Sequence, residues 1–301
     1  MTTLRNTLIT LLTLLPVAPA VAQDMRLADI LDESQGWELV AEGFAFTEGP
    51  AVDAKGALYF TDVFRGKIFR LNEAGKAEVF VDQSFGTNGL MFGPDGRLYG
   101  CQNGKKRIVA YDSAGKDSVI AEDVKSNDLV VTRAGAIYFT DPENQQIWYI
   151  SPRGEKRVVE RGLGYANGIA LWPDQGTLVV ADMKGFNLWA YRVEPDGSLK
   201  FKQPYYTMQL PAGKIDSGAD GMKIDAAGRA YVATHLGLQV FDPQGRLSGI
   251  IAKPQNAWLS NVVIGGPNLD TMYVTSTNKV FKRKVRIKGL RYFDPPSTSG
   301  G

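Results

Sequence analysis

The sequence has very little cysteine and histidine, and both shortages exclude common kinds of site. Its 301 residues include one cysteine, Cys101, and one histidine, His235. A single cysteine excludes an intrachain disulfide and a CxxC zinc site. A single histidine excludes HExxH sites and three-histidine zinc centres. A metal bound by this chain would therefore have mostly oxygen ligands.

The chain also lacks a large excess of charge of either sign. Its 34 lysines and arginines nearly balance 32 aspartates and glutamates, for a formal net charge of +2. This balance gives no reason to expect a nucleic-acid partner. A hydrophobic content of 44% and a charged content of 22% are ordinary for a globular protein. The length allows one large all-β domain or two average domains.

Long apolar runs are confined to the N-terminus. Arg5 precedes an apolar run from Leu8 to Val17, and Ala20-Val21-Ala22 follows it. This order is typical of a secretory signal peptide, and an N-terminal membrane anchor or core helix is the alternative. We expect residues 1–22 to be cleaved off, which would leave a soluble periplasmic or secreted protein with no membrane segment.

Helical periodicity is almost absent, and a repeat takes its place. Six segments each combine a turn with a strand of β-branched and aromatic residues; their turn positions are Gly56, Gly96, Gly135, Gly176, Gly228 and Asp270. Steps near 40 residues fit one four-stranded propeller blade. The pattern predicts an all-β fold, a six-bladed β-propeller with a central metal site, rather than a sandwich.

The repeat also suggests where the domain begins and ends. We expect the propeller to occupy residues 23–294, with residues 37–41 completing the last blade, and a disordered tail at residues 295–301. The long step between Gly176 and Gly228 predicts an insertion from Val193 to Ala219. Tyr205 and Tyr206 in this insertion either form a lip over the channel or pack within the loop.

One polar residue opens the predicted inner strand of every repeat. These residues are Glu48, Asn88, Asn127, Asn167, Asp220 and Asn261, each eight or nine residues before its turn position. Equivalent repeat positions occupy equivalent places, and the innermost strands of a propeller line its channel. The pattern therefore predicts two carboxylates and four carboxamides that face one another at one end of the channel.

A divalent cation would explain this convergence. Two carboxylates in a narrow channel repel each other and lose hydration, and a cation offsets both effects. An all-oxygen set favours calcium; magnesium or manganese is possible, and zinc is less suited. As an alternative, Asn-Gly and Asp-Gly could simply cap strand ends as turn formers. That alternative explains one or two of the positions but not six in register.

Several of these segments resemble a known family. They are Phe46-Thr47-Glu48-Gly49-Pro50, Ser126-Asn127-Asp128-Leu129-Val130, Ala166-Asn167-Gly168-Ile169-Ala170 and Asp220-Gly221-Met222-Lys223-Ile224-Asp225. Over about residues 37–285, the chain is similar to the gluconolactonase and senescence-marker-protein (regucalcin) family. The resemblance implies a six-bladed propeller with one catalytic divalent metal, bound by Glu48, Asn167 and Asp220. It implies that Asn127 touches the metal or the substrate.

The chemistry that this resemblance implies is metal-assisted hydrolysis of a lactone to an open hydroxy acid. The metal would polarise the carbonyl, and a carboxylate would take a proton from the attacking water. Asp220 is the first candidate for this catalytic role and Asp128 is the second. Asn127, Asn88 and Lys125 are the expected substrate-binding residues; Lys125 stands where some family members carry an arginine.

Two other functions stay open at the level of sequence. Relatives on the same scaffold cleave phosphotriesters or aryl lactones with a similar calcium site, and a propeller can also bind ligands without catalysis. We expect a small-molecule partner, and nothing in the sequence indicates an oligomeric state. His235 is interpreted as a structural residue at a strand end.

Overall fold

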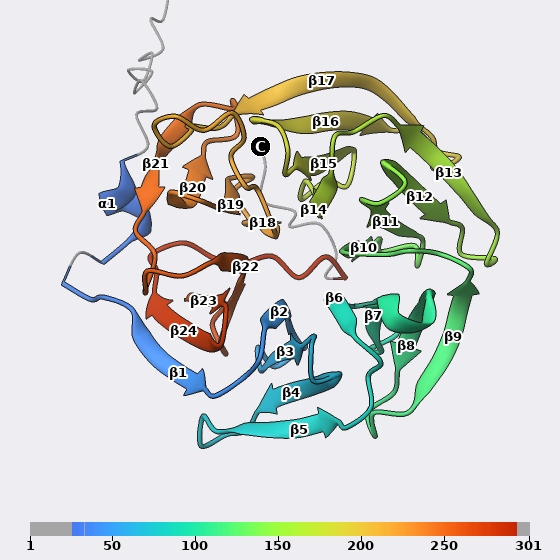
Figure 1. The fold of residues 1–301 in the computed structure, drawn as a ribbon, viewed down its shortest axis with the longest axis horizontal. Coiled ribbons are helices and arrows are strands. Elements are labelled where there is room, and N and C mark those ends of the chain that lie inside the picture. Colours follow the sequence, from blue (N-terminus) through green and yellow to red (C-terminus); the bar gives the residue numbers. More distant parts are fainter. Residues whose placement is uncertain (1–25, 33, 294–301) are drawn as a thin grey trace, which may run out of the picture.

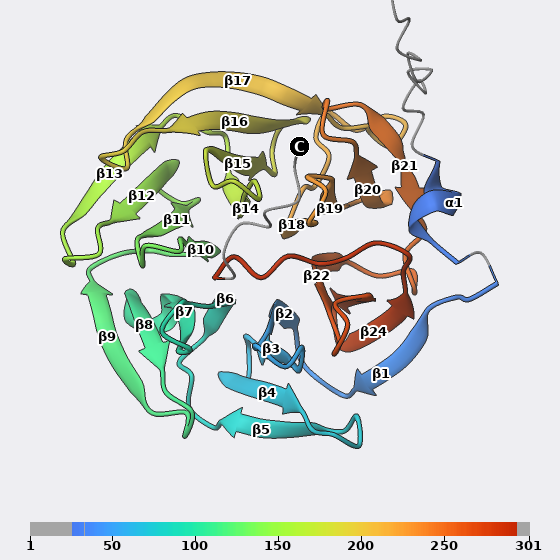
Figure 2. The ribbon, with the colours of Figure 1, turned by 180° about the vertical axis from the view of Figure 1, so that it is seen from behind.

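Six four-stranded antiparallel sheets surround a central axis (Figure 1), and Figure 2 shows the same ring from behind. The computed structural model describes residues 26–32 and 34–293. The predicted signal peptide, the predicted tail at 295–301 and the expected domain boundaries at 23 and 294 lie outside these residues. The six-bladed β-propeller predicted from the repeat is confirmed.

The first three blades follow one another along the chain, each from its inner to its outer strand. Blade 1 contains β2 (Thr47–Val52), β3 (Leu58–Asp62), β4 (Lys67–Leu71) and β5 (Ala77–Val81). Blade 2 contains β6 (Thr87–Phe92), β7 (Leu98–Gln102), β8 (Arg107–Tyr111) and β9 (Asp117–Glu122), with the short helix η1 (Asn103–Lys105) between β7 and β8. Blade 3 contains β10 (Leu129–Val131), β11 (Ile137–Asp141), β12 (Gln146–Ile150) and β13 (Lys156–Arg161).

The last three blades complete the ring. Blade 4 contains β14 (Ala166–Leu171), β15 (Thr177–Asp182), β16 (Asn187–Val193) and β17 (Leu199–Thr207). Blade 5 contains β18 (Met222–Ile224), β19 (Ala230–Thr234), β20 (Gly237–Phe241) and β21 (Leu247–Ile251). Blade 6 contains β22 (Leu259–Gly265), β23 (Thr271–Ser276), β24 (Lys279–Lys284) and β1 (Glu38–Glu42). A four-residue helix, α1 (Leu27–Ile30), precedes β1.

The N-terminal strand closes the ring, as predicted. β1 pairs with β24 in antiparallel register, with Glu38 opposite Lys282 and Glu42 opposite Lys279. This pairing gives blade 6 a fourth strand from the opposite end of the chain. It covers the edge of β24, whose backbone groups would otherwise lack partners, and it ties the first blade to the last.

An aspartate-glycine turn links the inner strand to the second strand in several blades. In blade 1, Asp53 Oδ1 accepts hydrogen bonds from the backbone N–H groups of Lys55 and Ala57, at 2.8 and 2.9 Å. Gly56 adopts the left-handed conformation that this turn requires (φ +81°). Asp225 makes the same pair of contacts in blade 5, at 2.9 and 3.0 Å. The repeat seen in the sequence is therefore a repeat of one turn geometry.

The core lies between neighbouring blades. The second strands β3, β11 and β19 are buried along their whole lengths because both faces of each sheet pack against another blade. Phe60, Phe139 and Tyr231 on these strands are fully buried. Each blade therefore contributes to two interfaces, and the ring is held together mainly by burial of apolar surface.

A C-terminal segment, residues 286–293, crosses one end of the channel (Figures 1 and 2). Its Arg286 N–H donates to the carbonyl oxygen of Ile30 at 2.8 Å, and the Tyr292 carbonyl accepts from Gln175 at 2.9 Å. Tyr292 is buried and lies near the C-terminal ends of the inner strands. The opposite end of the channel, where the inner strands begin, is the end that carries the predicted polar residues.

The predicted insertion from Val193 to Ala219 contains the outer strand of blade 4 and most of a long connection to blade 5. β17 (Leu199–Thr207) is the outer strand of blade 4, and residues 208–221 form the connection that leads to β18. Tyr206 is fully buried and packs edge-on against Phe241 at 5.4 Å, and Tyr205 packs on Tyr206. These two tyrosines pack between blade 4 and blade 5 and form no lip over the channel.

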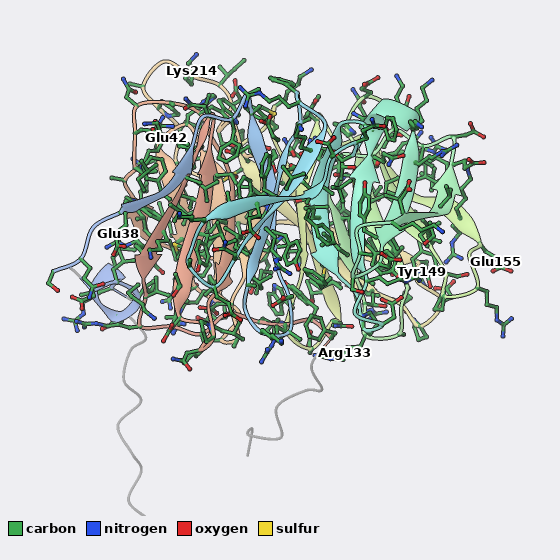
Figure 3. The ribbon with its side chains drawn as sticks, turned by 90° about the horizontal axis from the view of Figure 1, so that it is seen from below. Glu38, Glu42, Arg133, Tyr149, Glu155 and Lys214 are labelled. Atoms are coloured by element: carbon green, nitrogen blue, oxygen red, sulfur yellow. The ribbon has the colours of Figure 1, made fainter. Side chains whose placement is uncertain are left out.

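Figure 3 shows the propeller from the side, with Lys214 on one face and Arg133 on the opposite face. Lys214 belongs to the connection that leads into Asp220, and Arg133 follows the inner strand β10. The face near Lys214 is therefore the face on which the inner strands begin. Among the described residues, no helix has the length and apolar character needed to cross a membrane.

Candidate active site

The six polar residues stand at the beginning of the six inner strands, as the repeat predicted. Glu48, Asn88, Asn167 and Asn261 lie in β2, β6, β14 and β22, and Asn127 and Asp220 lie two residues before β10 and β18. The inner strands surround the axis, so all six residues lie around the same end of the channel.

Direct contacts link these residues across the boundaries between blades. Asn261 Nδ2 donates a hydrogen bond to Glu48 Oε2 at 2.9 Å, which joins blade 6 to blade 1. The carboxamide of Asn167 lies close enough to the carboxylate of Asp220 to lower its pKa, which brings blade 4 next to blade 5 at this point. The negative charges of Glu48 and Asp220 also act on each other. Residues far apart in the sequence thus form one connected polar cluster.

The glycines that follow several of these residues allow the inner strands to approach closely. A Cβ atom on Gly221 would lie 1.9 Å from Cγ of Asn261, and one on Gly168 would lie 2.3 Å from the carbonyl oxygen of Asp220. Neither glycine has a positive φ, so neither is needed for a left-handed turn. The Asn-Gly and Asp-Gly pairs here provide space around the axis.

Three carboxyl groups are buried at this end of the channel. Glu48, Asp220 and Asp128 are only 4%, 7% and 3% exposed. Burial raises the pKa of Glu48 well above its ordinary value, and the charge of Asp220 raises it further. Burial raises the pKa of Asp220 to about 7, against the effect of its hydrogen bonds from Trp258 and Asn167. A cation between these groups would offset their repulsion and lost hydration.

Asp128 occupies a special position in this cluster. Its Oδ1 accepts a hydrogen bond from the Leu129 N–H at 2.8 Å. Its Oδ2 is buried and has no partner in hydrogen-bond geometry among the described residues. Burial raises the pKa of Asp128, and the ammonium of Lys223, the Ile169 N–H and the Asn261 carboxamide oppose this rise. Asp128 is therefore a buried carboxyl group beside several groups that favour its charged form.

The expected substrate-binding residues differ in their surroundings. Asn88 and Asn127 are half-buried at the beginning of their strands. Lys125 pairs with Glu143 through Nζ and Oε2, and its side chain is about two-fifths exposed. The sequence did not indicate this ion pair between two partly exposed side chains.

Trp258 contacts the site but has no signature in the sequence. Its indole Nε1 donates a hydrogen bond to Asp220 Oδ2 at 2.6 Å across 38 residues of sequence. The ring of His235 packs edge-on against Trp258, with centroids 5.3 Å apart. No repeat position or motif marks Trp258, so only its contact with Asp220 identifies it.

The donor set for a metal consists of carboxylates and carboxamides. The described residues contain no group of three or more histidine, cysteine, aspartate or glutamate side chains arranged to hold a metal ion. A cation at this site would therefore need amide oxygens from Asn167 and Asn127 in addition to the carboxylates of Glu48 and Asp220. Such an oxygen set suits calcium.

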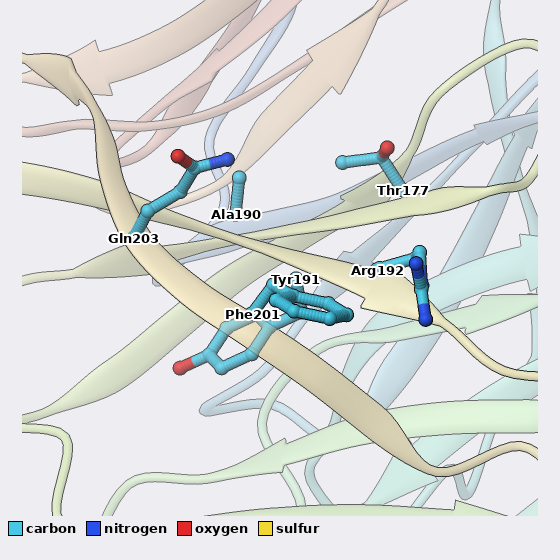
Figure 4. Close-up of a pocket in the computed structure, with 6 residues that line it drawn as sticks. All are labelled: Thr177, Ala190, Tyr191, Arg192, Phe201 and Gln203. Carbon is cyan, nitrogen blue, oxygen red and sulfur yellow. The ribbon is translucent and has the colours of Figure 1, made fainter.

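A separate cavity of about 310 Å³ lies on blade 4, away from the inner strands (Figure 4). It is lined by parts of β15, β16 and β17, including Arg192 and Phe201. The guanidinium of Arg192 lies 4.3 Å from the centre of the Phe201 ring and bonds to Glu194 at 2.7 Å. This cavity contains none of the predicted site residues.

The chain is similar to proteins described as gluconolactonases and as regucalcin. A gluconolactonase of Zymomonas mobilis is 28% identical over 309 residues, covering 88% of this chain and 85% of that protein. Among solved structures, XC5397 from Xanthomonas campestris, described as a gluconolactonase, has a TM-score of 0.76 at 24% identity, covering 86% of this chain and 92% of that one. Regucalcin from Agrobacterium tumefaciens, described as a calcium-binding protein, has a TM-score of 0.74 at 19% identity, covering 87% and 97%.

The pattern of the SMP-30/Gluconolactonase/LRE-like region matches residues 46–278. This match begins two residues before Glu48 and includes the beginning of every inner strand. Because it spans well over half of the sequence, the chain belongs to the SMP-30/gluconolactonase/LRE-like family.

Proposed function

We propose that this protein is a metal-dependent lactonase that opens a sugar lactone to its hydroxy acid. The observation that carries the proposal is the cluster of Glu48, Asn167 and Asp220 at one end of the channel in a chain of this family. The gluconolactonase of Zymomonas mobilis, which aligns with most of this chain, supports the reaction class.

The residues at the site fit one divalent cation. Glu48, Asn167 and Asp220 are the proposed ligands, and Asn127 is the fourth residue, next to the metal or the substrate. The buried carboxyl groups of Glu48, Asp128 and Asp220 support the binding of positive charge at this end of the channel. We propose calcium, with zinc, manganese or magnesium as possible substitutes. The calcium-binding protein with the same fold is consistent with this choice.

A bound cation would supply Lewis acidity toward the lactone carbonyl and the attacking water. The chain's own residues would bind the lactone and accept a proton. Asp220 is the first candidate to accept the water proton, and Asp128 is the alternative acceptor; both carboxyl groups are buried at this end of the channel. Asn127, Asn88 and Lys125 would hold the substrate from the side of blades 2 and 3.

A substrate panel tests the reaction class. We expect hydrolysis of glucono-δ-lactone in calcium, with the signal lost in excess chelator and restored by adding calcium back. An aryl lactone and a phosphotriester, each assayed in calcium, zinc and manganese, separate the sugar lactonase from the alternative esterase. Full lactonase activity in chelator, with the metal shown by elemental analysis to be gone, would contradict the mechanism. Tight sugar binding without turnover would favour a binding propeller.

We also propose that residues 1–22 are a signal peptide and that the mature protein is periplasmic or secreted. The Arg5 to Ala22 pattern supports this. N-terminal sequencing of protein from its native host should find Gln23 first. A retained Met1, or recovery only with membranes, would contradict export.

A further inference from the structure

The indole of Trp258 is one of the closest polar partners of the proposed ligand Asp220. Trp258 lies directly before β22 in blade 6, whereas Asp220 lies before β18 in blade 5. Its Nε1 donates to Asp220 Oδ2 at 2.6 Å. A hydrogen bond of this length to a carboxylate is among the stronger kinds in proteins because the acceptor carries charge.

The backbone of Trp258 is fixed by the strand-to-strand turn of its own blade. The Trp258 carbonyl oxygen accepts hydrogen bonds from Ser276 Oγ at 3.0 Å and from Thr277 Oγ1 at 3.2 Å. Ser276 is the last residue of β23, and Thr277 lies in the turn between β23 and β24. The backbone of Trp258 is therefore held by this turn of blade 6.

The ring of Trp258 is supported by residues of blade 5. His235 packs edge-on against the indole, with an angle of 84° between the ring planes. His235 Nε2 lies 3.0 Å from Asp216 Oδ1, and the His235 N–H donates to the carbonyl oxygen of Ser217 at 3.0 Å. A Cβ atom on Gly218 would lie 2.6 Å from the His235 ring, so only glycine leaves room for the imidazole there.

We propose that Trp258 is a positioning residue for the metal site. Its N–H holds Oδ2 of Asp220, so that the other oxygen of this carboxylate is the one presented to the cation. The pair formed by His235 and Asp216 keeps the indole in place. This inference rests on the proposed function, because it assigns Trp258 a task only if Asp220 binds a metal.

The physical reason is rotational freedom. Without this partner, only Asn167 and the Gly221 N–H still act on the Asp220 carboxylate, which can then rotate more freely about its last side-chain bond and present either oxygen to the channel. Fixing one oxygen lowers the entropy lost when a cation binds, and it sets the direction of the ligand lone pairs. Removal of hydrogen bonds that orient ligands typically weakens metal affinity by about 10- to 100-fold.

The test replaces Trp258 by phenylalanine, which keeps an aromatic ring beside His235 and removes the N–H. Calcium titrated alone into metal-free Trp258→Phe by calorimetry should bind about 10- to 100-fold more weakly than to the wild type. Trp172→Phe is the matched control: its Nε1 bonds to the Tyr206 hydroxyl at 3.2 Å, outside the site, and its calcium affinity should be unchanged. Equal affinity in Trp258→Phe and the wild type would overturn the inference.

His235→Leu separates support of the indole from a direct role in the reaction. If His235 acts through Trp258, this variant weakens calcium binding by less than Trp258→Phe does. The double variant should then bind no more weakly than Trp258→Phe alone. A large loss of turnover with unchanged calcium affinity would instead assign His235 to the reaction itself and overturn its supporting role.

A measurement without metal keeps this inference distinguishable from the proposed function. The chain has five tryptophans, so the indole N–H signals of the metal-free protein are few, and the signal missing in Trp258→Phe belongs to Trp258. That signal should shift in Asp220→Ala. A signal that stays in place would overturn the inference even if the wild type binds calcium. If the Trp258 signal shifts in Asp220→Ala but the wild type binds no metal, the proposed function is contradicted, and Trp258 loses its assigned task.

Discussion

Individual residues at this site combine two demands, burial and charge. Glu48, Asp128 and Asp220 carry carboxyl groups into a channel where water is scarce, and burial raises the pKa of each. A fold that only needed to be stable would place apolar side chains there, because buried charges seldom stabilise a protein. The unfavourable burial of three carboxyl groups at this site is consistent with the binding of a positively charged ligand.

Replacement of Asp220 tests this view most directly. Asp220→Ala removes a proposed ligand and the first candidate base together, so kcat/KM for glucono-δ-lactone should fall by about a thousandfold or more. Glu48→Gln keeps the side-chain shape but removes one charge, and it should weaken calcium binding in calorimetry. Asp82→Ala, at an exposed aspartate of blade 1, is the control and should retain activity. Near-normal activity of Asp220→Ala would remove Asp220 from the mechanism.

Substitution of the glycines beside the polar residues by alanine should also disturb the site, because the added methyl group has no room. In Gly221→Ala the new methyl group would overlap the carboxamide of Asn261, whose Nδ2 donates to Glu48. We expect a loss of about 1–3 kcal/mol in the free energy of unfolding, measured in urea, and weaker calcium binding. Gly176→Ala is the matched control, because its new Cβ would lie no closer than 3.5 Å to another atom. Equal stability of both variants would show that the inner strands have room to move apart.

Among the elements, the inner strands position the site and the chain ends close the structure around it. β1 completes blade 6, and residues 286–293 cover the end of the channel opposite the polar cluster. Residues 290–293 of the segment that crosses the channel line one small cavity together with the inner-strand residues Leu90, Met91 and Val263. Access to the site is therefore expected from the face on which the inner strands begin.

Tyr292 anchors this C-terminal segment in the hydrophobic core. Its side chain is buried against the ends of the inner strands, so Tyr292→Ala should leave a cavity and lower the free energy of unfolding by about 3–5 kcal/mol. Phe201→Ala, at an exposed aromatic residue of β17, is the control and should cost far less. Urea unfolding monitored by circular dichroism measures both. A small effect of Tyr292→Ala would mean that the segment contributes little to stability.

The whole molecule should keep its fold without the metal. The blades bury their apolar faces against one another, and the hydrophobic clusters extend between sheets without using the channel residues Glu48 or Asp220. Far-ultraviolet circular dichroism should therefore be unchanged in chelator. Calcium at 100 times its Kd should still stabilise the folded wild type by about 2.7 kcal/mol through binding linkage.

Urea unfolding with and without calcium separates stabilisation by specific calcium binding from a general salt effect. Calcium should raise the unfolding midpoint of the wild type but leave that of Asp220→Ala nearly unchanged. Collapse of the wild-type fold in chelator would contradict the independence of the blades from the ion. An equal shift in both proteins would place the bound calcium elsewhere.

The sequence alone determined the number of blades, the closing role of the strand near Trp37 and the six polar positions. It could do so because each blade repeats one turn geometry at steps near 40 residues, and equivalent positions in a repeat occupy equivalent places around an axis. Where the repeat was stretched, the prediction was right only in part. The segment between Val193 and Ala219 was expected to be an insertion, and it consists of the outer strand β17 followed by most of the long connection that leads to β18.

Only the tertiary structure decided which side chains meet across blades. The bond from Trp258 to Asp220, the ion pair of Lys125 with Glu143 and the segment around Tyr292 at the closed end of the channel have no periodic signature. These contacts depend on how neighbouring sheets pack and on where the chain runs after its last blade. A repeat specifies the positions of backbones around the axis, whereas the direction of each side chain follows from the packing of its particular neighbours.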